Sequence, residues 1–277
     1  MAAEPAVWRE FAPAKVNLFL HVRGRRADGY HLLESLAVFP QVGDSLEARP
    51  AAGLTLTADG PFGAELDCGP GNLVLRAARG AGASGLAFRL TKRLPVASGI
   101  GGGSSDAAAA LRIVARAGFE APPGFAPSLG ADVPVCLEPG SRIMSGVGEQ
   151  LAPGPRHPAF WMLLVNPGVA VATGPVFDAL ATRDNPPGPA ASATGFADFH
   201  DFIAWLALQR NDLEAPARRI APAIGEVLAA LGQAPLARMS GSGASCFALF
   251  ETERAARGID LPPGWWSAVA RVPAHGG

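Results

Sequence analysis

Pro95–Ala108 read PVASGIGGGSSDAA, a run of glycines and serines that leads through an acid into alanines. Glycine loses much conformational entropy on folding, so this density outside a linker indicates that the main chain turns sharply or closely approaches something. A strand-like segment, LAFRLTKRLPVAS, precedes the glycines, and a strong helix pattern, SSDAAAALRIVARAG, follows them and ends at Gly118. The predicted order is strand, glycine loop, helix. Candidate N-caps of this helix are Ser104, Ser105 and Asp106.

Such a loop favours anion binding, because backbone N–H groups and the positive end of the helix dipole meet at one point. A Walker A loop is excluded, since GxxxxGK[ST] needs a lysine where Ser104 or Ser105 stands, and no G-x-G-x-x-G passes through GIGGGSS. The chain also contains no G-x-S-x-G, the spacing of a serine hydrolase elbow. Phosphate binding outside these motifs and a tightly packed structural loop both remain open.

Composition predicts an ordinary globular protein. The chain has 277 residues, of which 49% are hydrophobic and 17% charged, enough for one large or two modest domains. Its formal net charge of -1 gives no indication of a nucleic-acid or membrane partner. The N-terminus shows no targeting pattern, and no apolar stretch reaches membrane-spanning length. The three dispersed cysteines, without CxxC spacing, favour a reducing, cytoplasmic setting; they are Cys68, Cys136 and Cys246.

The first half is predicted to be rich in strands. Residues 15–22, KVNLFLHV, alternate with period two and place Lys15 and Asn17 on a mostly polar face. Further strand-like segments follow turns at Asp28-Gly29 and Gly43-Asp44. A helix is expected to begin near Asn72, an acceptable N-cap.

The second half is predicted to mix strands and helices. Strands are expected in 141–151 and 160–171, on either side of the proline-rich link APGPRHP, and we place a domain boundary between residues 155 and 156. Helices are expected in 197–209 and 221–233, followed by a second glycine-rich turn that leads into an apolar strand. The segment DNPPGPAASATG resembles a flexible loop.

Lysine is rare in this chain. Of 23 basic residues, only Lys15 and Lys92 are lysines. An ammonium that persists in an arginine-rich background can mark a position that needs a compact point charge. Survival at the surface by chance is the alternative for both.

Several segments together carry a family resemblance. LPVASGIGGGSSDAAAAL resembles the glycine-serine motif of the GHMP kinases, the group of galactokinase, homoserine kinase and mevalonate kinase, and MSGSGASCFALF resembles their C-terminal glycine motif. The resemblance narrows to the member that acts on a cytidine diphosphate-linked methylerythritol because of three further segments, PAKVNLFL, RRADGYH and LGADVPVCL. The resemblance implies an α+β (α/β) GHMP kinase-like fold of two interleaved domains with the active-site cleft between them. Residues 1–155 would form the ATP-binding domain and residues 156–277 the C-terminal domain.

The same resemblance implies an activity. The chain would be an ATP-dependent kinase that phosphorylates the 2-hydroxyl of this acceptor, in the non-mevalonate route to isoprenoid precursors, with Mg²⁺ accompanying ATP. We expect a cytoplasmic monomer or weak homodimer with a small-molecule substrate. Another GHMP small-molecule kinase, of the homoserine or mevalonate type, and a non-catalytic nucleotide-binding member are the alternatives.

The resemblance also implies roles for residues. Asp132 would be the general base and Lys15 would hold that carboxylate ionised and offset developing charge, although GADVP also fits a turn or helix cap. Asp106 could act near phosphates or simply complement the helix dipole. Residues expected at ATP are Asn72, Lys92, Gly99, Ile100, Gly101, Gly102, Gly103, Ser104, Ser105 and Asp106.

The acceptor is expected to be held by its cytidine end. Tyr30 and Phe177 would sandwich the pyrimidine by resemblance, since stacking needs flat aromatic faces. Core packing is the alternative for Phe177, and a solvated surface position is the alternative for Asn17 and Thr173. Residues expected at the acceptor are Asn17, Tyr30, His31, Thr173, Phe177, Gly241 and Ser242.

Overall fold

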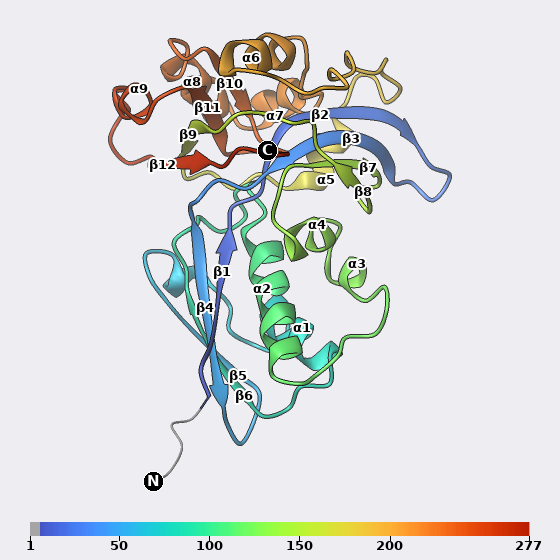
Figure 1. Cartoon of the computed structure of the whole chain (residues 1–277), viewed down its shortest axis with the longest axis vertical. Coiled ribbons are helices and arrows are strands. Elements are labelled where there is room, and N and C mark those ends of the chain that lie inside the picture. The colour runs from blue at the N-terminus through green and yellow to red at the C-terminus, as the bar shows by residue number, and fades with distance from the viewer. Residues whose placement is uncertain (1–5, 277) are drawn as a thin grey trace. The chain divides into compact units, whose positions relative to one another are not determined.

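The computed structural model describes residues 6–276 and contains helices and strands in comparable measure (Figure 1). Two compact units interleave along the chain. Unit 1 takes the described residues up to Ala14, Gly43–Val96 and Gly101–Glu138, and unit 2 takes Lys15–Val42, Ala97–Ile100 and the described residues from Pro139 onward. The glycine loop therefore contributes residues to both units. Residues 155 and 156 both belong to unit 2, so the boundary expected there does not separate these units and stays a prediction.

Unit 1 is a four-stranded sheet with helices packed against it. The strand order is β1-β4-β6-β5, and only the β5–β6 pair is parallel. The long helix α2 packs against α1 and against strands β1 and β4, and the alanine run Ala107–Ala110 is buried. Bounds are β1 Trp8–Pro13, β4 Gly43–Pro50, β5 Thr55–Asp59, η1 Gly63–Glu65, α1 Leu73–Gly80, β6 Leu86–Thr91, α2 Gly102–Arg116, α3 Ala126–Leu129 and α4 Val133–Leu137.

The helix ends of unit 1 follow the sequence in part. Asn72 caps α1 as expected, because its Oδ1 accepts a hydrogen bond of 2.9 Å from the Val74 N–H. The caps expected for α2 are wrong: the N-cap is Gly101, at φ 65°, and no side chain caps the helix. Glycine adopts this left-handed conformation readily, so the turn into α2 is made by backbone alone. Gly118, at φ 91°, follows the end of α2 as expected.

Unit 2 contains two four-stranded antiparallel sheets. Their strand orders are β2-β3-β7-β8 and β10-β11-β9-β12 (Figure 1). Strand bounds are β2 Val16–Arg25, β3 His31–Val38, β7 Arg142–Gly146, β8 Gln150–Pro153, β9 Phe160–Asn166, β10 Leu236–Met239, β11 Cys246–Phe250 and β12 Trp266–Val272. Helix bounds are α5 Thr173–Asp178, α6 Phe199–Ala207, α7 Glu214–Ile220, α8 Ala223–Ala230 and α9 Glu253–Arg257.

The core of unit 2 joins distant parts of the chain. Leu20 and Val22 of β2 lie in one hydrophobic cluster with Val165 of β9, Val176 of α5 and Ala248 of β11. The C-terminal strands and helices therefore support the strand that begins beside Lys15. Within residues 6–276, no helix has the length and apolar character needed to cross a membrane.

Candidate active site

The two glycine motifs meet in unit 2. Gly99 has φ +75°, and a Cβ added to it would lie 2.8 Å from the Gly243 carbonyl carbon and 3.1 Å from the Ser240 carbonyl oxygen. Ser245 N–H donates to the Ser98 carbonyl at 3.1 Å, and the Ser240 hydroxyl donates to the Gly99 carbonyl at 3.1 Å. Glycine at 99 is therefore required both by its φ and by the close approach of another backbone segment.

Lys15 begins a buried polar network next to these motifs. Its backbone N–H donates to the Ile100 carbonyl at 2.9 Å, and its Nζ donates to Asn17 Oδ1 at 2.8 Å. Asn17 Nδ2 donates to the Ser35 hydroxyl at 2.6 Å, and Asn17 N–H donates to the Ser240 hydroxyl at 3.1 Å. The Lys15 and Asn17 side chains are buried, so their orientation is fixed by neighbours in unit 2.

Exposure differs between the two residues for which a solvated surface position was the alternative, Asn17 and Thr173. A solvated surface position is wrong for Asn17, which lies inside the network above. Thr173 is exposed, and its hydroxyl lies 2.9 Å from the Ser242 hydroxyl. The start of α5 and the C-terminal glycine turn thus present two adjacent hydroxyls.

The aromatic residues expected at the acceptor include one stacked pair. His31 and Phe177 stack on each other, with ring centroids 4.6 Å apart and planes 22° apart. Tyr30 is 65% exposed. Phe177 is partly buried against the hydrophobic core of unit 2, so it packs there and also carries a ring partner. Burial is the largest cause that lowers the pKa of His31, and the charge of the nearby Arg25 lowers it further. The neutral imidazole is therefore favoured.

The start of α2 in unit 1 suits an anion. Ser105 N–H makes the first intrahelical hydrogen bond, to the Gly101 carbonyl at 2.9 Å. The preceding N–H groups, of residues 102–104, receive no side-chain cap, and the helix is 15 residues long. Ser104 is partly exposed, whereas the Ser105 hydroxyl is buried without a hydrogen-bond partner among residues 6–276. Ser104 therefore presents the more accessible hydroxyl.

Lys92 lies in a buried cluster of unit 1. Its Nζ donates to Asp44 Oδ2 at 2.6 Å and to Asp106 Oδ2 at 2.7 Å. Asp44 Oδ1 accepts from the backbone N–H groups of Arg93 and Leu94 at 2.6 and 2.9 Å. Burial raises the pKa of Asp106 to about 7 despite the Lys92 ammonium, and its Oδ1 has no hydrogen-bond partner in the described chain. Asp106 is thus a buried partner of Lys92 and not a solvated acid at the helix end.

The other two unit 1 candidates lie at helix starts. Asn72 caps α1, and its Nδ2 also donates to the Asp67 carbonyl at 2.7 Å. Asp132 stands at the N-cap position of α4, but its side chain makes no capping hydrogen bond. The capping alternative for Asp132 is therefore not realised. Among residues 6–276, no group of three or more His, Cys, Asp or Glu side chains is placed to hold a metal ion.

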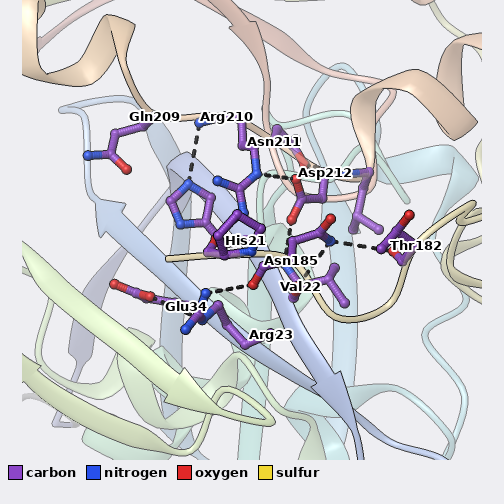
Figure 2. Close-up of polar contacts among 12 residues, drawn as sticks. His21, Val22, Arg23, Glu34, Thr182, Asn185, Gln209, Arg210, Asn211 and Asp212 are labelled. Atoms are coloured by element: carbon purple, nitrogen blue, oxygen red, sulfur yellow. Dashed lines mark hydrogen bonds and ion pairs between the residues drawn. The ribbon is translucent and has the colours of Figure 1, made fainter. Parts of the chain in front are cut away.

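Sequence patterns did not single out the segment Gln209–Asp212, which lies along the edge of β2. Leu20 N–H donates to the Arg210 carbonyl at 3.0 Å, and Asp212 N–H donates to the Leu20 carbonyl at 2.9 Å. Asp212 Oδ2 also accepts from Val22 N–H at 2.7 Å (Figure 2). Asn211 Nδ2 donates to the carbonyls of Met239 and Gly241 at 2.8 and 2.9 Å. No local pattern marks this asparagine, because its partners are about thirty residues away.

The loop 184–195 has no regular structure, as expected, yet hydrogen bonds attach it to β2 and to this segment. Asn185 N–H donates to the Val22 carbonyl at 3.2 Å, and Arg23 Nη1 donates to the Asn185 carbonyl at 2.6 Å (Figure 2). Gln209 Nε2 donates to the Pro189 carbonyl at 2.8 Å. The resemblance to a flexible loop therefore captures its irregular shape but not its anchoring.

Comparison with known proteins gives consistent matches. A model of the GHMP kinases N terminal domain matches residues 72–123, and a model of the GHMP kinases C terminal matches residues 190–259. The 4-diphosphocytidyl-2-C-methyl-D-erythritol kinase of Cereibacter sphaeroides (strain ATCC 17029 / ATH 2.4.9) is 54% identical over 274 residues, covering 95% of this chain and 98% of that protein. The Paracoccus denitrificans (strain Pd 1222) protein of the same name is 52% identical over 269 residues, covering 95% and 96%.

Solved structures agree. A crystal structure of 4-(cytidine 5'-diphospho)-2C-methyl-D-erythritol kinase matches with a TM-score of 0.71 and 33% identity, covering 98% of this chain and 100% of that one. The homoserine kinase from Cytophaga hutchinsonii matches with a TM-score of 0.63 and 17% identity, covering 99% and 97%. The second likeness is one of fold.

Proposed function

Because this chain belongs to the GHMP kinase family, we propose that it phosphorylates the 2-hydroxyl of 4-(cytidine 5'-diphospho)-2-C-methyl-D-erythritol with ATP as the donor. The observation that carries the proposal is the 54% identity to a kinase of that name along 95% of the chain. This identity favours the cytidine-linked acceptor over a homoserine or mevalonate-type substrate. The free thiols of Cys68, Cys136 and Cys246 support a cytoplasmic setting. A monomer or weak homodimer remains our expectation.

The residues at the start of α2 fit the phosphates of ATP. Uncapped N–H groups at residues 102–104 are the groups an anion needs, and the partly exposed Ser104 hydroxyl can add a donor. We assign Gly99–Ser105 to the phosphates, and Asn72 and Lys92 to the nucleoside side, by resemblance. Mg²⁺ would neutralise phosphate charge when it accompanies ATP, and we name no protein ligand for it.

Phosphoryl transfer needs positioning, charge stabilisation and removal of one proton. We propose that the Asp132 carboxylate accepts the proton of the acceptor 2-hydroxyl as the new O–P bond forms and the bond to ADP breaks. The Lys15 ammonium would offset the charge that develops on the transferred group. Its hydrogen bond to Asn17 supports this role, because a held ammonium loses little freedom when substrate binds.

The acceptor would be selected at its cytidine end. The stacked His31 and Phe177 rings form a flat aromatic surface, and the exposed Tyr30 is available to cover a base. The adjacent hydroxyls of Thr173 and Ser242 are candidate hydrogen-bond partners of the acceptor.

The test is ADP release from Mg-ATP with the cytidine-linked acceptor, for wild type, Asp132→Asn and Lys15→Ala. The control is Asp260→Asn, a change at an exposed aspartate. We expect both site variants to lose on the order of 10²-fold or more in kcat while they still bind nucleotide. We expect CMP to compete with the acceptor. Turnover of homoserine or mevalonate in place of this acceptor would overturn the substrate assignment, and full activity of Asp132→Asn would overturn the base.

A further inference from the structure

Arg238 of β10 is a buried cation whose hydrogen-bond partners are backbone carbonyls. Its Nη1 donates to the Leu18 carbonyl at 2.6 Å, and its Nη2 donates to the carbonyls of Leu206 and Gln209 at 3.0 and 2.9 Å. Arg238 is 8% exposed. Burial lowers its pKa to about 10, so it remains charged at neutral pH. Within residues 6–276 no carboxylate forms an ion pair with it, although the nearby Glu214 charge raises its pKa. Burying a charge without a bonded carboxylate is expensive, so a specific role would explain this arginine.

Two of the three carbonyls belong to the end of α6. Leu206 lies in the last turn of that helix, and Gln209 follows it. The last carbonyls of a helix lack intrahelical donors and carry the negative end of its dipole, so a guanidinium there is favourable. Through Nη2, Arg238 therefore connects β10 to the C-terminal end of α6. Its Nη1 remains available to donate to β2.

The third carbonyl lies at a β-bulge. In the pairing of β2 with β3, Asn17 is opposite Ala37 and Phe19 is opposite Leu36, so Leu18 is the extra residue on β2. A bulge interrupts the ladder locally and redirects the side chains next to it. Arg238 donates to the carbonyl of this extra residue and also to the Leu206 carbonyl of α6, so it connects the bulge to α6.

The bulge lies within the network that orients Lys15. Asn17, which accepts from Lys15 Nζ, immediately precedes Leu18, and Phe19 follows it. The Ser35 hydroxyl accepts from Asn17 Nδ2 and donates to the Phe19 carbonyl at 2.6 Å, so it spans the bulge. A shift of the Leu18 carbonyl would move both ends of this bridge.

We propose that Arg238 is a positioning residue that holds the β2 bulge at Leu18 and so keeps Lys15 and Asn17 aligned for phosphoryl transfer. The catalytic part of this inference rests on the proposed function. Arginine suits the role because its planar fork reaches carbonyls on two segments at once. Lysine, with one nitrogen, keeps the charge but cannot reproduce that geometry.

The experiment compares Arg238→Lys and Arg238→Met with Arg219→Met. Arg219 is a matched control in unit 2, because its Nη2 also donates to a backbone carbonyl, that of Ala179, but from an exposed position. The first readout is hydrogen exchange of the segment 14–20, followed by mass spectrometry. We expect faster exchange there in Arg238→Lys and in folded Arg238→Met, but not in the control. Unchanged exchange in folded Arg238→Lys overturns the inference, whatever the substrate.

The second readout is kinetic. We expect Arg238→Lys to lose on the order of 10²-fold in kcat, with KM for both substrates little changed, since a misplacement near 1 Å has about that effect. Combining it with Lys15→Ala should add little further loss, because both changes disable the same ammonium. The inference is overturned if the fold-losses in kcat of the two single variants multiply in the double variant. It is also overturned if kcat is unchanged in folded Arg238→Lys. An inactive wild type beside faster exchange in the variants would refute the proposed function and leave the bulge role supported.

Discussion

Replacing Gly99 with alanine tests whether the contact between the glycine motifs of unit 2 is obligatory. A left-handed φ of +75° costs an alanine about 1–2 kcal/mol relative to ordinary conformations. The new Cβ would also be in contact with the Gly243 carbonyl group and lie 3.1 Å from the Ser240 carbonyl oxygen, so backbone must move. Overpacking of this kind costs roughly 1–3 kcal/mol. We therefore expect Gly99→Ala to lose roughly 2–5 kcal/mol of unfolding free energy.

The matched control is Gly168→Ala, also in unit 2. Gly168 has φ +77° with no heavy atom within 4 Å of an added Cβ, so this variant should show only the conformational loss of about 1–2 kcal/mol. Urea unfolding at pH 7.5 gives both values, and ADP release gives kcat, which should fall on the order of 10²-fold for Gly99→Ala alone. Equal stabilities of the two folded variants would refute the close-approach explanation.

Three further predictions concern buried polar groups. Burial, and after it the Arg210 charge, lowers the pKa of His21 from 6.5 to about 4. The unfolded chain therefore binds a proton at this histidine before the folded protein does, so the full stability is present above pH 6.5. About 3 kcal/mol of unfolding free energy is lost as the pH falls to 4. His21→Phe should flatten that part of the urea-unfolding pH profile, and an unchanged slope contradicts the assignment. The raised pKa of Asp106 makes its contribution greatest below pH 4 and lost as pH rises to about 7. The unfolding free energy of Asp106→Asn, relative to that of wild type, should therefore be higher at pH 8 than at pH 5. An equal difference at the two pH values refutes this. Asn211→Asp replaces a donor to two carbonyls with an acceptor, so we expect a loss of about 3 kcal/mol in urea unfolding, whereas a loss below 1 kcal/mol would show that those bonds matter little.

Local patterns predicted the elements around the glycine loop because local physics determines them. The apolar strand before the loop, the alanine-rich helix after it and the Asn72 cap are all short-range features. The cap of α2 was missed because three polar residues matched the usual preference while Gly101 made the turn through its backbone. Hydroxyl and carboxyl side chains at the start of a helix therefore do not establish which of them caps it.

Long-range partners could not be predicted in this way. Arg238 is one of many arginines, and its partner Leu18 lies 220 residues away in the sequence. The rarity of lysine marked Lys15 and Lys92 equally, although Lys92 lies between two carboxylates and Lys15 donates to an amide. Such distinctions depend on which segments the fold brings together, and composition contains no information about that.

The pairing of Lys92 has a consequence for how ATP would be bound. The Lys92 ammonium is already paired with the carboxyl groups of Asp44 and Asp106, at 2.6 and 2.7 Å. This cluster therefore supplies no net positive charge to a triphosphate at the start of α2. Because Asp106 has a pKa of about 7, a proton on it removes much of the repulsion that an approaching phosphate would meet. If ATP phosphates bind at the start of α2 as proposed, the groups left to hold them are the backbone N–H groups of residues 102–104. These donors need glycines at the loop and no side-chain cap that competes for them.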